Sequence, residues 1–236
     1  MATTATGSDV PTYTCPQGHA VRAWPAPHKP WMRRMNRALC PECVVMEKER
    51  DAEQQAEATR QRQEAAWHAL CPPLYRETDP DRLPADKLAE AMSWQWGPEG
   101  LLLIGPTGTG KTRCAYLLLK RLLKEGRVIR AFDCAAFSHE CSRRFRDGTG
   151  EDWTDGLAKV EVVFLDDVGK MSFTERAETE LFARVERRGA NKLPIIGTTN
   201  MVGADIEAKA SADRGAPLVR RLREFCGQVV FEGTRR

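Results

Sequence analysis

The sequence predicts an α/β fold in which a parallel five-stranded sheet is flanked by helices, and three observations carry this prediction. Five apolar runs of strand length recur through the last two thirds of the 236-residue chain. A glycine-rich loop separates the first run from a segment of helix-forming residues. The third run ends directly in two aspartates. Apolar strands at such intervals, separated by helical segments, are typical of a parallel sheet with crossover connections.

The glycine-rich loop is the strongest functional signal. Residues 105–112 match G-x-x-x-x-G-K-[ST] at every fixed position, after the apolar run 101–104 and before the helix-forming segment 114–124. Glycines let backbone N–H groups turn toward phosphate oxygens, and a helix N-terminus adds a favourable dipole. We expect Lys111 to reach the β- and γ-phosphates and the Thr112 hydroxyl to hold Mg²⁺. A glycine-rich turn without a ligand is the alternative, and the flanking strand and helix argue against it. The expected nucleotide-binding residues are Gly105, Pro106, Thr107, Gly108, Thr109, Gly110, Lys111 and Thr112.

Polar residues follow two of the later apolar runs. Asp166 and Asp167 come directly after the run 162–165. An apolar strand that ends in a carboxylate is what the Mg²⁺ site of a P-loop enzyme requires, so we expect Asp166 to hold the metal through water, opposite Thr112. Asp167 is then expected to act as the base that polarises the attacking water. Asn200 ends another run and is expected to orient that water or touch the γ-phosphate. The alternative for Asn200 is a turn former after a strand.

The N-terminal third contains a candidate zinc site. Cys15 and His19 form one pair, and Cys40 and Cys43 form a Cys-x-x-Cys pair 20 residues further on. Three cysteines and a histidine are an accepted ligand set for structural zinc. Because so small a segment has little core of its own, metal binding would supply its folding energy. Two alternatives stay open: Cys40 and Cys43 could form a redox pair, and His28 could replace His19 as the fourth ligand.

A basic and aromatic stretch lies between the two pairs. It holds five Lys or Arg residues and no acidic residue, interleaved with Trp24 and Trp31. Basic side chains neutralise phosphates and indole rings stack on bases, so this stretch is a candidate surface for single-stranded DNA or for a protein. The alternative is that the tryptophans pack against the zinc knuckles while the arginines are solvated.

The segment that follows predicts a helical linker. Residues 44–70 contain neither Pro nor Gly, and they are rich in Glu, Gln, Ala and Arg with few apolar residues. That composition favours a solvated helix, which residues 71–73, Cys-Pro-Pro, would end. The predicted organisation is therefore a disordered leader 1–12, a zinc-binding module 13–45, a helical linker 46–71 and an ATP-binding domain 72–236.

Net charge, hydropathy and cysteine content limit the classes of protein to which the chain can belong. The net charge of +3 is close to neutral, so any nucleic-acid surface must be local. No apolar run approaches the roughly 18 residues of a membrane span, and the first ten residues lack the pattern of a secretory signal. Eight cysteines beside an intracellular nucleotide motif indicate thiols or metal ligands, not disulfides. We expect a cytoplasmic protein with no membrane partner.

Over about residues 70–232 the chain resembles the helicase-loader branch of the AAA+ ATPases, the DnaC/IstB-like family. The motifs that carry the resemblance are the loop 102–112, Val-Phe-Leu-Asp-Asp-Val-Gly at 163–169, the Leu-Phe helix 180–188 and Ile-Ile-Gly-Thr-Thr-Asn at 195–200. The resemblance implies an ATPase with an AAA+ core, bound ATP and Mg²⁺, and ATP-bridged self-assembly.

The resemblance also assigns roles to two residues. It implies that Asn200 is sensor 1 and that Arg221, in Val-Arg-Arg-Leu at 219–222, is the arginine finger. The chain departs from the family where Asp167 replaces a frequent glutamate, which predicts slow turnover. Arg235 and Arg236 are the only late candidates for a sensor-2 arginine.

The function that follows is that of a helicase loader. It would bind a hexameric DnaB-type replicative helicase through the zinc module and help place it on single-stranded DNA. The alternative is an IstB-like transposition helper ATPase that binds duplex DNA and recruits a transposase. Residues 1–70 carry nine Lys or Arg against eight Asp or Glu, a balance that favours the loader. A regulator that binds ATP but hardly hydrolyses it is a third possibility.

Overall fold

A computed structural model describes residues 12–14, 17–22, 41–170, 174–200 and 215–233 of the chain. The chain divides into two compact units, Met1–Arg62 and Gln63–Arg236. In the first unit, β1 (Thr12–Thr14) pairs antiparallel with β2 (Ala20–Arg22), with Tyr13 opposite Val21. Of the expected leader only Thr12 is described, as the first residue of β1.

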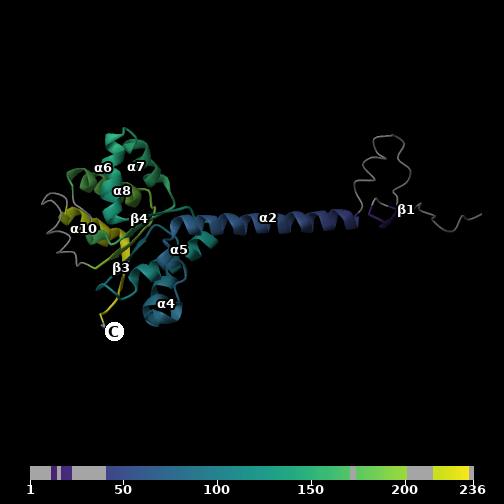
Figure 1. The fold of residues 1–236 in the computed structure, drawn as a ribbon, viewed down its shortest axis with the longest axis horizontal. Coiled ribbons are helices and arrows are strands. Elements are labelled where there is room, and N and C mark those ends of the chain that lie inside the picture. The colour runs from purple at the N-terminus through teal and green to yellow at the C-terminus, as the bar shows by residue number, and fades with distance from the viewer. Residues whose placement is uncertain (1–11, 15–16, 23–40, 171–173, 201–214, 234–236) are drawn as a thin grey trace, which may run out of the picture. The chain divides into compact units, whose positions relative to one another are not determined.

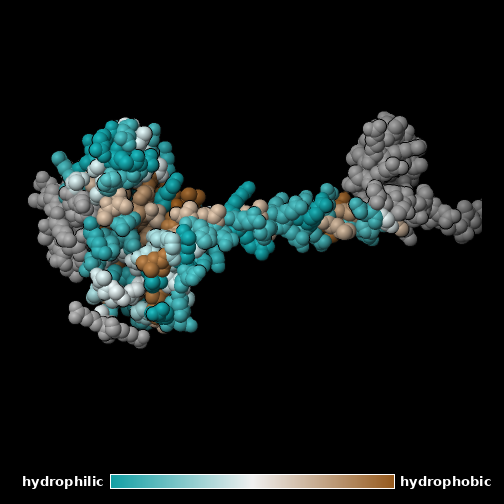
Figure 2. Space-filling view, viewed as in Figure 1, coloured by the Kyte–Doolittle hydropathy of each residue, from teal (hydrophilic) through white to brown (hydrophobic). Residues whose placement is uncertain are grey.

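The predicted linker helix is present as α2 (Pro41–Leu70), which begins three residues before the helix-forming segment 44–70. Residues 45–62 are all exposed, as the polar composition predicts, and Figure 2 shows hydrophilic residues along most of the helix. Two apolar side chains near its start, Val45 and Met46, are exposed as well. The second unit begins within α2 and before the expected domain start at residue 72.

The last turn of α2 belongs to the core of the second unit. The Trp67 ring meets the Tyr116 ring edge-on at 6.3 Å between centroids, and Cys71 just beyond the helix is buried. An indole that packs in this way buries a large apolar area, so this turn contributes to the stability of the second unit. The helix of mostly solvated residues therefore ends in an anchored segment.

The second unit is built on the predicted parallel five-stranded sheet. Its strands lie in the order β4 (Ile129–Asp133), β5 (Val162–Asp166), β6 (Ile195–Thr199), β3 (Gly100–Ile104) and β7 (Cys226–Val230), and every neighbouring pair is parallel. Each of the five apolar runs forms one of these strands, which confirms the predicted fold class. All five strands end at the same edge of the sheet because they are parallel.

Alternate residues of each strand face opposite sides of the sheet, and each side has its own hydrophobic core. Val162 and Phe164 of β5 pack in the cluster that contains α5, whereas Val163 and Leu165 pack in the cluster beneath α6, α7, α8 and α10. The result is a three-layer arrangement of helices, sheet and helices (Figure 1). The helices of this unit are α3 (Pro73–Arg76), α4 (Ala85–Ser93), α5 (Lys111–Lys124), α6 (Cys134–Arg146), α7 (Gly150–Lys159), α8 (Glu175–Ala190) and α10 (Gly215–Phe225), with short turns η1 (Pro80–Arg82) and η2 (Val168–Lys170).

The described part of the chain contains neither a membrane-spanning helix nor a disulfide. No helix there is both long and apolar enough to cross a membrane. None of the cysteines there takes part in a disulfide.

Candidate nucleotide-binding site

The glycine-rich loop connects the end of β3 to the first residue of α5, and two of its glycines are required, Gly105 by a close backbone contact and Gly110 by its backbone conformation. A Cβ atom on Gly105 would lie 2.2 Å from the carbonyl oxygen of Phe231, which no side chain tolerates. Gly110 caps α5 with φ of 92°, and a Cβ there would lie 2.6 Å from Leu83. Glycine at both positions lets the backbone pass closely beneath its neighbours. The loop therefore leads directly to the N-terminus of α5, where anions bind favourably.

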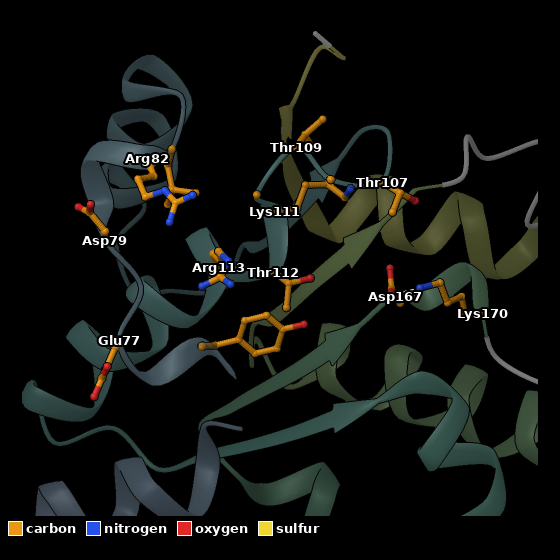
Figure 3. Close-up of a pocket in the computed structure, with 14 residues that line it drawn as sticks. Glu77, Asp79, Arg82, Thr107, Thr109, Lys111, Thr112, Arg113, Asp167 and Lys170 are labelled. Carbon is orange, nitrogen blue, oxygen red and sulfur yellow. Dashed lines mark hydrogen bonds and ion pairs between the residues drawn. The ribbon is translucent and has the colours of Figure 1, made fainter. Parts of the chain in front are cut away.

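A cavity of about 470 Å³ opens beside this loop (Figure 3). Its volume falls in the range of sites for small molecules and cofactors. One wall is the loop and the start of α5, a second comes from the segment 75–83, and a third from the turn that follows β5. The lining residues are Tyr75, Glu77, Asp79, Arg82, Leu83, Thr107, Gly108, Thr109, Gly110, Lys111, Thr112, Arg113, Asp167 and Lys170.

Lys111 is largely buried, with 6% of its surface exposed, although it carries an ammonium group. Its Nζ donates a hydrogen bond of 2.7 Å to the carbonyl oxygen of Pro106 within the loop. Burial lowers the pKa of this ammonium from its ordinary value, while the charges of Asp167 and Asp166 act in the opposite direction. The ammonium therefore lies at the cavity wall, where a phosphate would add negative charge.

Thr112 and Asp166, the two residues expected to hold Mg²⁺, are in direct contact. The Thr112 hydroxyl donates to Asp166 Oδ1 at 2.9 Å, and the Thr198 hydroxyl donates to the same oxygen. Burial raises the pKa of the Asp166 carboxyl, and the two hydroxyl hydrogen bonds oppose that effect. A threonine hydroxyl and a carboxylate are the hard oxygen ligands that Mg²⁺ prefers, so these residues fit the metal.

Asp167 follows β5 in an uncommon backbone conformation, with φ of 53°. Its N–H donates to the Thr198 hydroxyl at 2.9 Å. Its carboxylate accepts a hydrogen bond of 2.6 Å from Lys170 Nζ, and Figure 3 shows the two side chains side by side at the cavity wall. Thr198 therefore accepts from Asp167 and donates to Asp166, which fixes the two aspartates relative to β6.

Asn200 reaches the site because β6 lies between β3 and β5 in the sheet. Its Nδ2 donates to the Thr107 hydroxyl at 3.2 Å, so the amide lies against the loop. The carbonyl oxygen of Thr199, one residue earlier, accepts a hydrogen bond of 3.1 Å from the Gly105 N–H. The end of β6 therefore contacts the loop on one side and the aspartates on the other. Contact of Asn200 with water or phosphate stays a prediction.

Arg221 lies elsewhere, on α10, and is not one of the described residues that line the cavity. Its guanidinium donates to Glu186 of α8 and, at 2.8 Å, to Glu224 of its own helix. A role in the cavity of its own chain has no support from these contacts. Action in the site of a neighbouring copy stays a prediction. The other late arginines considered, Arg235 and Arg236, lie outside the described residues.

Two of the four expected zinc ligands are described, and they lie together. His19 Nδ1 is 3.3 Å from Cys43 Sγ, and His19 Nε2 is 3.5 Å from a carboxylate oxygen of Glu42. Within the described residues no group of three or more His, Cys, Asp or Glu side chains could hold a metal. Cys15 and Cys40 lie outside those residues, as do His28 and the Trp24 and Trp31 stretch, so the complete zinc set stays a prediction.

Several residues that line the cavity or contact its aspartates were missed by the sequence reasoning. Lys170 follows Asp167 at a spacing of three, which one helical turn brings together, and this spacing could have revealed the pair. Thr198 lies within an apolar strand, and no neighbouring residue in the sequence marks it as part of a site. The segment 75–83 precedes the loop by more than twenty residues and contains no phosphate-binding pattern. Within it, Tyr75 stacks on Tyr116 with centroids 5.0 Å apart, and Arg113 lies over the Tyr75 ring.

Comparison with known sequences gives one family match. The family described as IstB-like ATP binding protein matches residues 45–212 of the chain. That range includes the loop, both aspartates and Asn200, and it covers well over half of the sequence. No curated protein is similar enough to count as a relative.

Comparison with solved structures finds the same fold in a replication initiator, in a helicase loader and in DnaI. The replication initiator DnaA bound to AMPPCP and single-stranded DNA is 21% identical with a TM-score of 0.56, and the match covers 69% of this chain and 51% of that one. The DnaC helicase loader is 20% identical with a TM-score of 0.53, covering 62% of this chain and 86% of that one. DnaI is 18% identical with a TM-score of 0.55, covering 70% and 93%. The chain spans about half the length of the initiator, and at these identities the likeness shows the fold alone.

Proposed function

Because the chain belongs to the IstB-like ATP binding protein family, we propose that it binds and hydrolyses ATP. We propose further that it loads a hexameric, DnaB-type replicative helicase onto single-stranded DNA. The observation that carries the ATPase part is that Lys111, Thr112 and Asp167 line one cavity, while Asp166 accepts a hydrogen bond from the Thr112 hydroxyl. Helicase loading is a separate part of the proposal, and it rests on the N-terminal zinc module.

The extent of the structural matches supports a loader. The match covers 86% of the solved chain of the DnaC loader and 93% of that of DnaI, against 51% of the solved DnaA chain. The initiator was solved with single-stranded DNA and a nucleotide analogue, and we propose single-stranded DNA as a partner of this chain by analogy with that complex.

The site residues would divide the work of hydrolysis among them. Lys111 would bind the β- and γ-phosphates, and Asn200 would orient a water for attack on the γ-phosphorus. Asp167 would take the proton of that water as the new P–O bond forms, and ADP would leave with the bridging oxygen. Mg²⁺, held by Thr112 and Asp166, would neutralise charge on the phosphates when bound.

We assign the grip on the helicase to the N-terminal zinc module, with Cys15, His19, Cys40 and Cys43 as ligands. The contact of His19 with Cys43 at 3.3 Å supports this ligand set, since the two members lie 24 residues apart in sequence. Copies of the chain would assemble through bound ATP, with Arg221 of one copy reaching the nucleotide of the next. The site of action would be the cytoplasm.

A transposition helper remains the rival, and the family description itself favours it because the family takes its name from IstB. Such a protein would bind duplex DNA and recruit a transposase. A duplex-binding module is expected to be strongly basic, because DNA affinity arises mainly from phosphate contacts. Residues 1–70 have nine basic against eight acidic residues, which favours a protein partner.

The deciding experiment mixes the protein with the DnaB-type helicase of its own source. Size-exclusion chromatography with light scattering, with and without ATP and Mg²⁺, would detect a joint complex. A stable complex that is lost on deletion of residues 1–43 supports the loader and its N-terminal grip. If no complex forms under either condition, while the protein binds duplex DNA, the transposition helper replaces it.

Metal analysis tests the zinc module separately. The purified chain is expected to contain one zinc ion per copy, and Cys40→Ser is expected to lose it together with helicase binding. Cys141→Ala is the matched control, because Cys141 is a buried thiol of α6 in the other unit. If the Cys40→Ser variant keeps both its zinc and its helicase binding, the proposed zinc module is wrong.

A further inference from the structure

Lys170 and Asp167 are joined twice, through the backbone and through their side chains. The Lys170 N–H donates to the Asp167 carbonyl oxygen at 2.8 Å, which closes the turn η2. The Lys170 ammonium donates to Asp167 Oδ2 at 2.6 Å. Val168, between them, is buried in the core with 2% of its surface exposed, so the turn is anchored. The ion pair is thus a product of the turn that directly follows β5.

The opposite side of Asp167 is held as well. Its φ of 53° is uncommon for a residue with a side chain, and its N–H is bound by the Thr198 hydroxyl at 2.9 Å. The backbone is therefore fixed from β6, and the carboxylate is fixed from η2. The Asp167 side chain has little freedom to turn while both contacts last.

Lys170 differs from Lys111 and Arg113, two other cations of the cavity wall, in what it binds. Lys111 donates to the Pro106 carbonyl oxygen, and Arg113 donates to the Leu74 carbonyl oxygen and the Thr78 hydroxyl. Only Lys170, of these three, donates to the carboxylate that we expect to act as the base. In Figure 3 its side chain approaches Asp167 from the side away from Lys111.

We propose that Lys170 is a positioning residue that holds the Asp167 carboxylate on η2, away from the attacking water, and so keeps basal ATP hydrolysis slow. This inference rests on the proposed role of Asp167 as the base. A base must bring an oxygen within hydrogen-bond distance of the proton it takes. The two oxygens of a carboxylate turn as one rigid group, so the hydrogen bond from Lys170 to Oδ2 restrains Oδ1 as well. With 54% of its side chain exposed, Lys170 is able to leave, so a change at η2 would release the base.

The test is steady-state ATP hydrolysis by the full chain carrying Lys170→Met. We expect kcat to rise about two- to fivefold and KM for ATP to stay unchanged. This rise in kcat corresponds to the free energy that a partly exposed ion pair contributes. Lys170→Arg keeps a cation on the carboxylate and is expected to keep the slow rate. Lys170→Gln, which keeps a polar end without charge, is expected to be fast like Lys170→Met. Lys159→Met removes an exposed lysine at the end of α7 and is the control for loss of charge alone.

The outcomes separate this inference from the proposed function. If the wild-type chain hydrolyses ATP but kcat of Lys170→Met and Lys170→Gln is unchanged or lower, the restraint by Lys170 is wrong and the ATPase stands. If KM changes in place of kcat, Lys170 binds nucleotide and the restraint is again wrong. If every variant binds a fluorescent ATP analogue and none hydrolyses ATP, the reaction itself is absent and both ideas fall together.

Discussion

At the scale of single residues, Thr198 connects the two aspartates of the site. It is fully buried in β6, and its hydroxyl accepts the Asp167 N–H while donating to Asp166 Oδ1. One hydroxyl therefore satisfies a buried backbone donor and opposes the rise that burial causes in the pKa of Asp166. Neither task can be performed by an apolar side chain of the same shape.

Thr198→Val should weaken both stability and metal-dependent binding. The unpaired Asp167 N–H is expected to cost about 1–3 kcal/mol of unfolding free energy, measurable in urea. Without the Thr198 hydroxyl, burial raises the pKa of Asp166 further. A carboxyl of higher pKa is protonated at higher pH, so affinity for ATP with Mg²⁺ should fall earlier in the variant as the pH is lowered.

The matched control for this prediction is Thr154→Val. Thr154 is also a buried threonine, in α7, and its hydroxyl donates to the Glu151 carbonyl oxygen at 3.0 Å. It should lose stability without any change in how ATP affinity depends on pH. Equal pH profiles for Thr198→Val and the wild type would show that Thr198 has no influence on Asp166.

At the scale of elements, Arg188 attaches α8 to the ends of other elements. It is almost fully buried, with 1% of its surface exposed. Its Nη1 donates to the carbonyl oxygens of Leu157 and Val160, at 2.8 and 2.7 Å. Its Nη2 donates to those of Glu161 and Pro194, at 3.1 and 2.8 Å. Burial lowers the pKa of this guanidinium to about 10, so it stays charged at neutral pH, and α8 is fixed just before β5 and β6 begin.

Arg188→Lys should therefore destabilise the second unit strongly. A lysine keeps the charge but has no planar fork, so it leaves buried carbonyl groups unpaired, at an expected cost of about 3 kcal/mol. Urea unfolding measures the loss. The neighbouring Arg187→Lys, whose exposed guanidinium pairs with Asp155 at 2.7 Å, should cost less than about 1 kcal/mol. Similar losses in the two variants would contradict the structural role of Arg188.

Local patterns explain which elements could be predicted from the sequence. The loop, its strand and its helix are adjacent in the chain, and the aspartates end an apolar run, so their arrangement follows from spacing alone. Arg188 and Thr198 contact partners far away in sequence, and nothing beside them distinguishes them from a surface arginine or a strand threonine. The segment 75–83 reaches the cavity only through packing such as the Tyr75 and Tyr116 stack.

At the scale of the whole molecule, Arg221 raises the question of assembly. Its guanidinium is held by Glu186 and Glu224 of the same chain, away from the cavity. An arginine finger acts on the phosphates of a neighbour, and it contributes by stabilising charge in the transition state. If Arg221 has this role, assembly must exchange its contact with Glu186 for one with the neighbouring site.

A mixing experiment tests action between copies. Arg221→Ala should bind ATP like the wild type but hydrolyse it at least about tenfold more slowly when assembled, because the finger is absent. Lys111→Ala should fail to bind ATP while its Arg221 stays intact. In a mixture of the two, an interface that joins an intact loop to an intact Arg221 is complete, so hydrolysis should return. Arg220→Ala, an exposed neighbour on the same helix, should need no partner to be active. If the mixture is no more active than the sum of its parts, Arg221 acts only within its own chain, as its contacts with Glu186 and Glu224 would then explain.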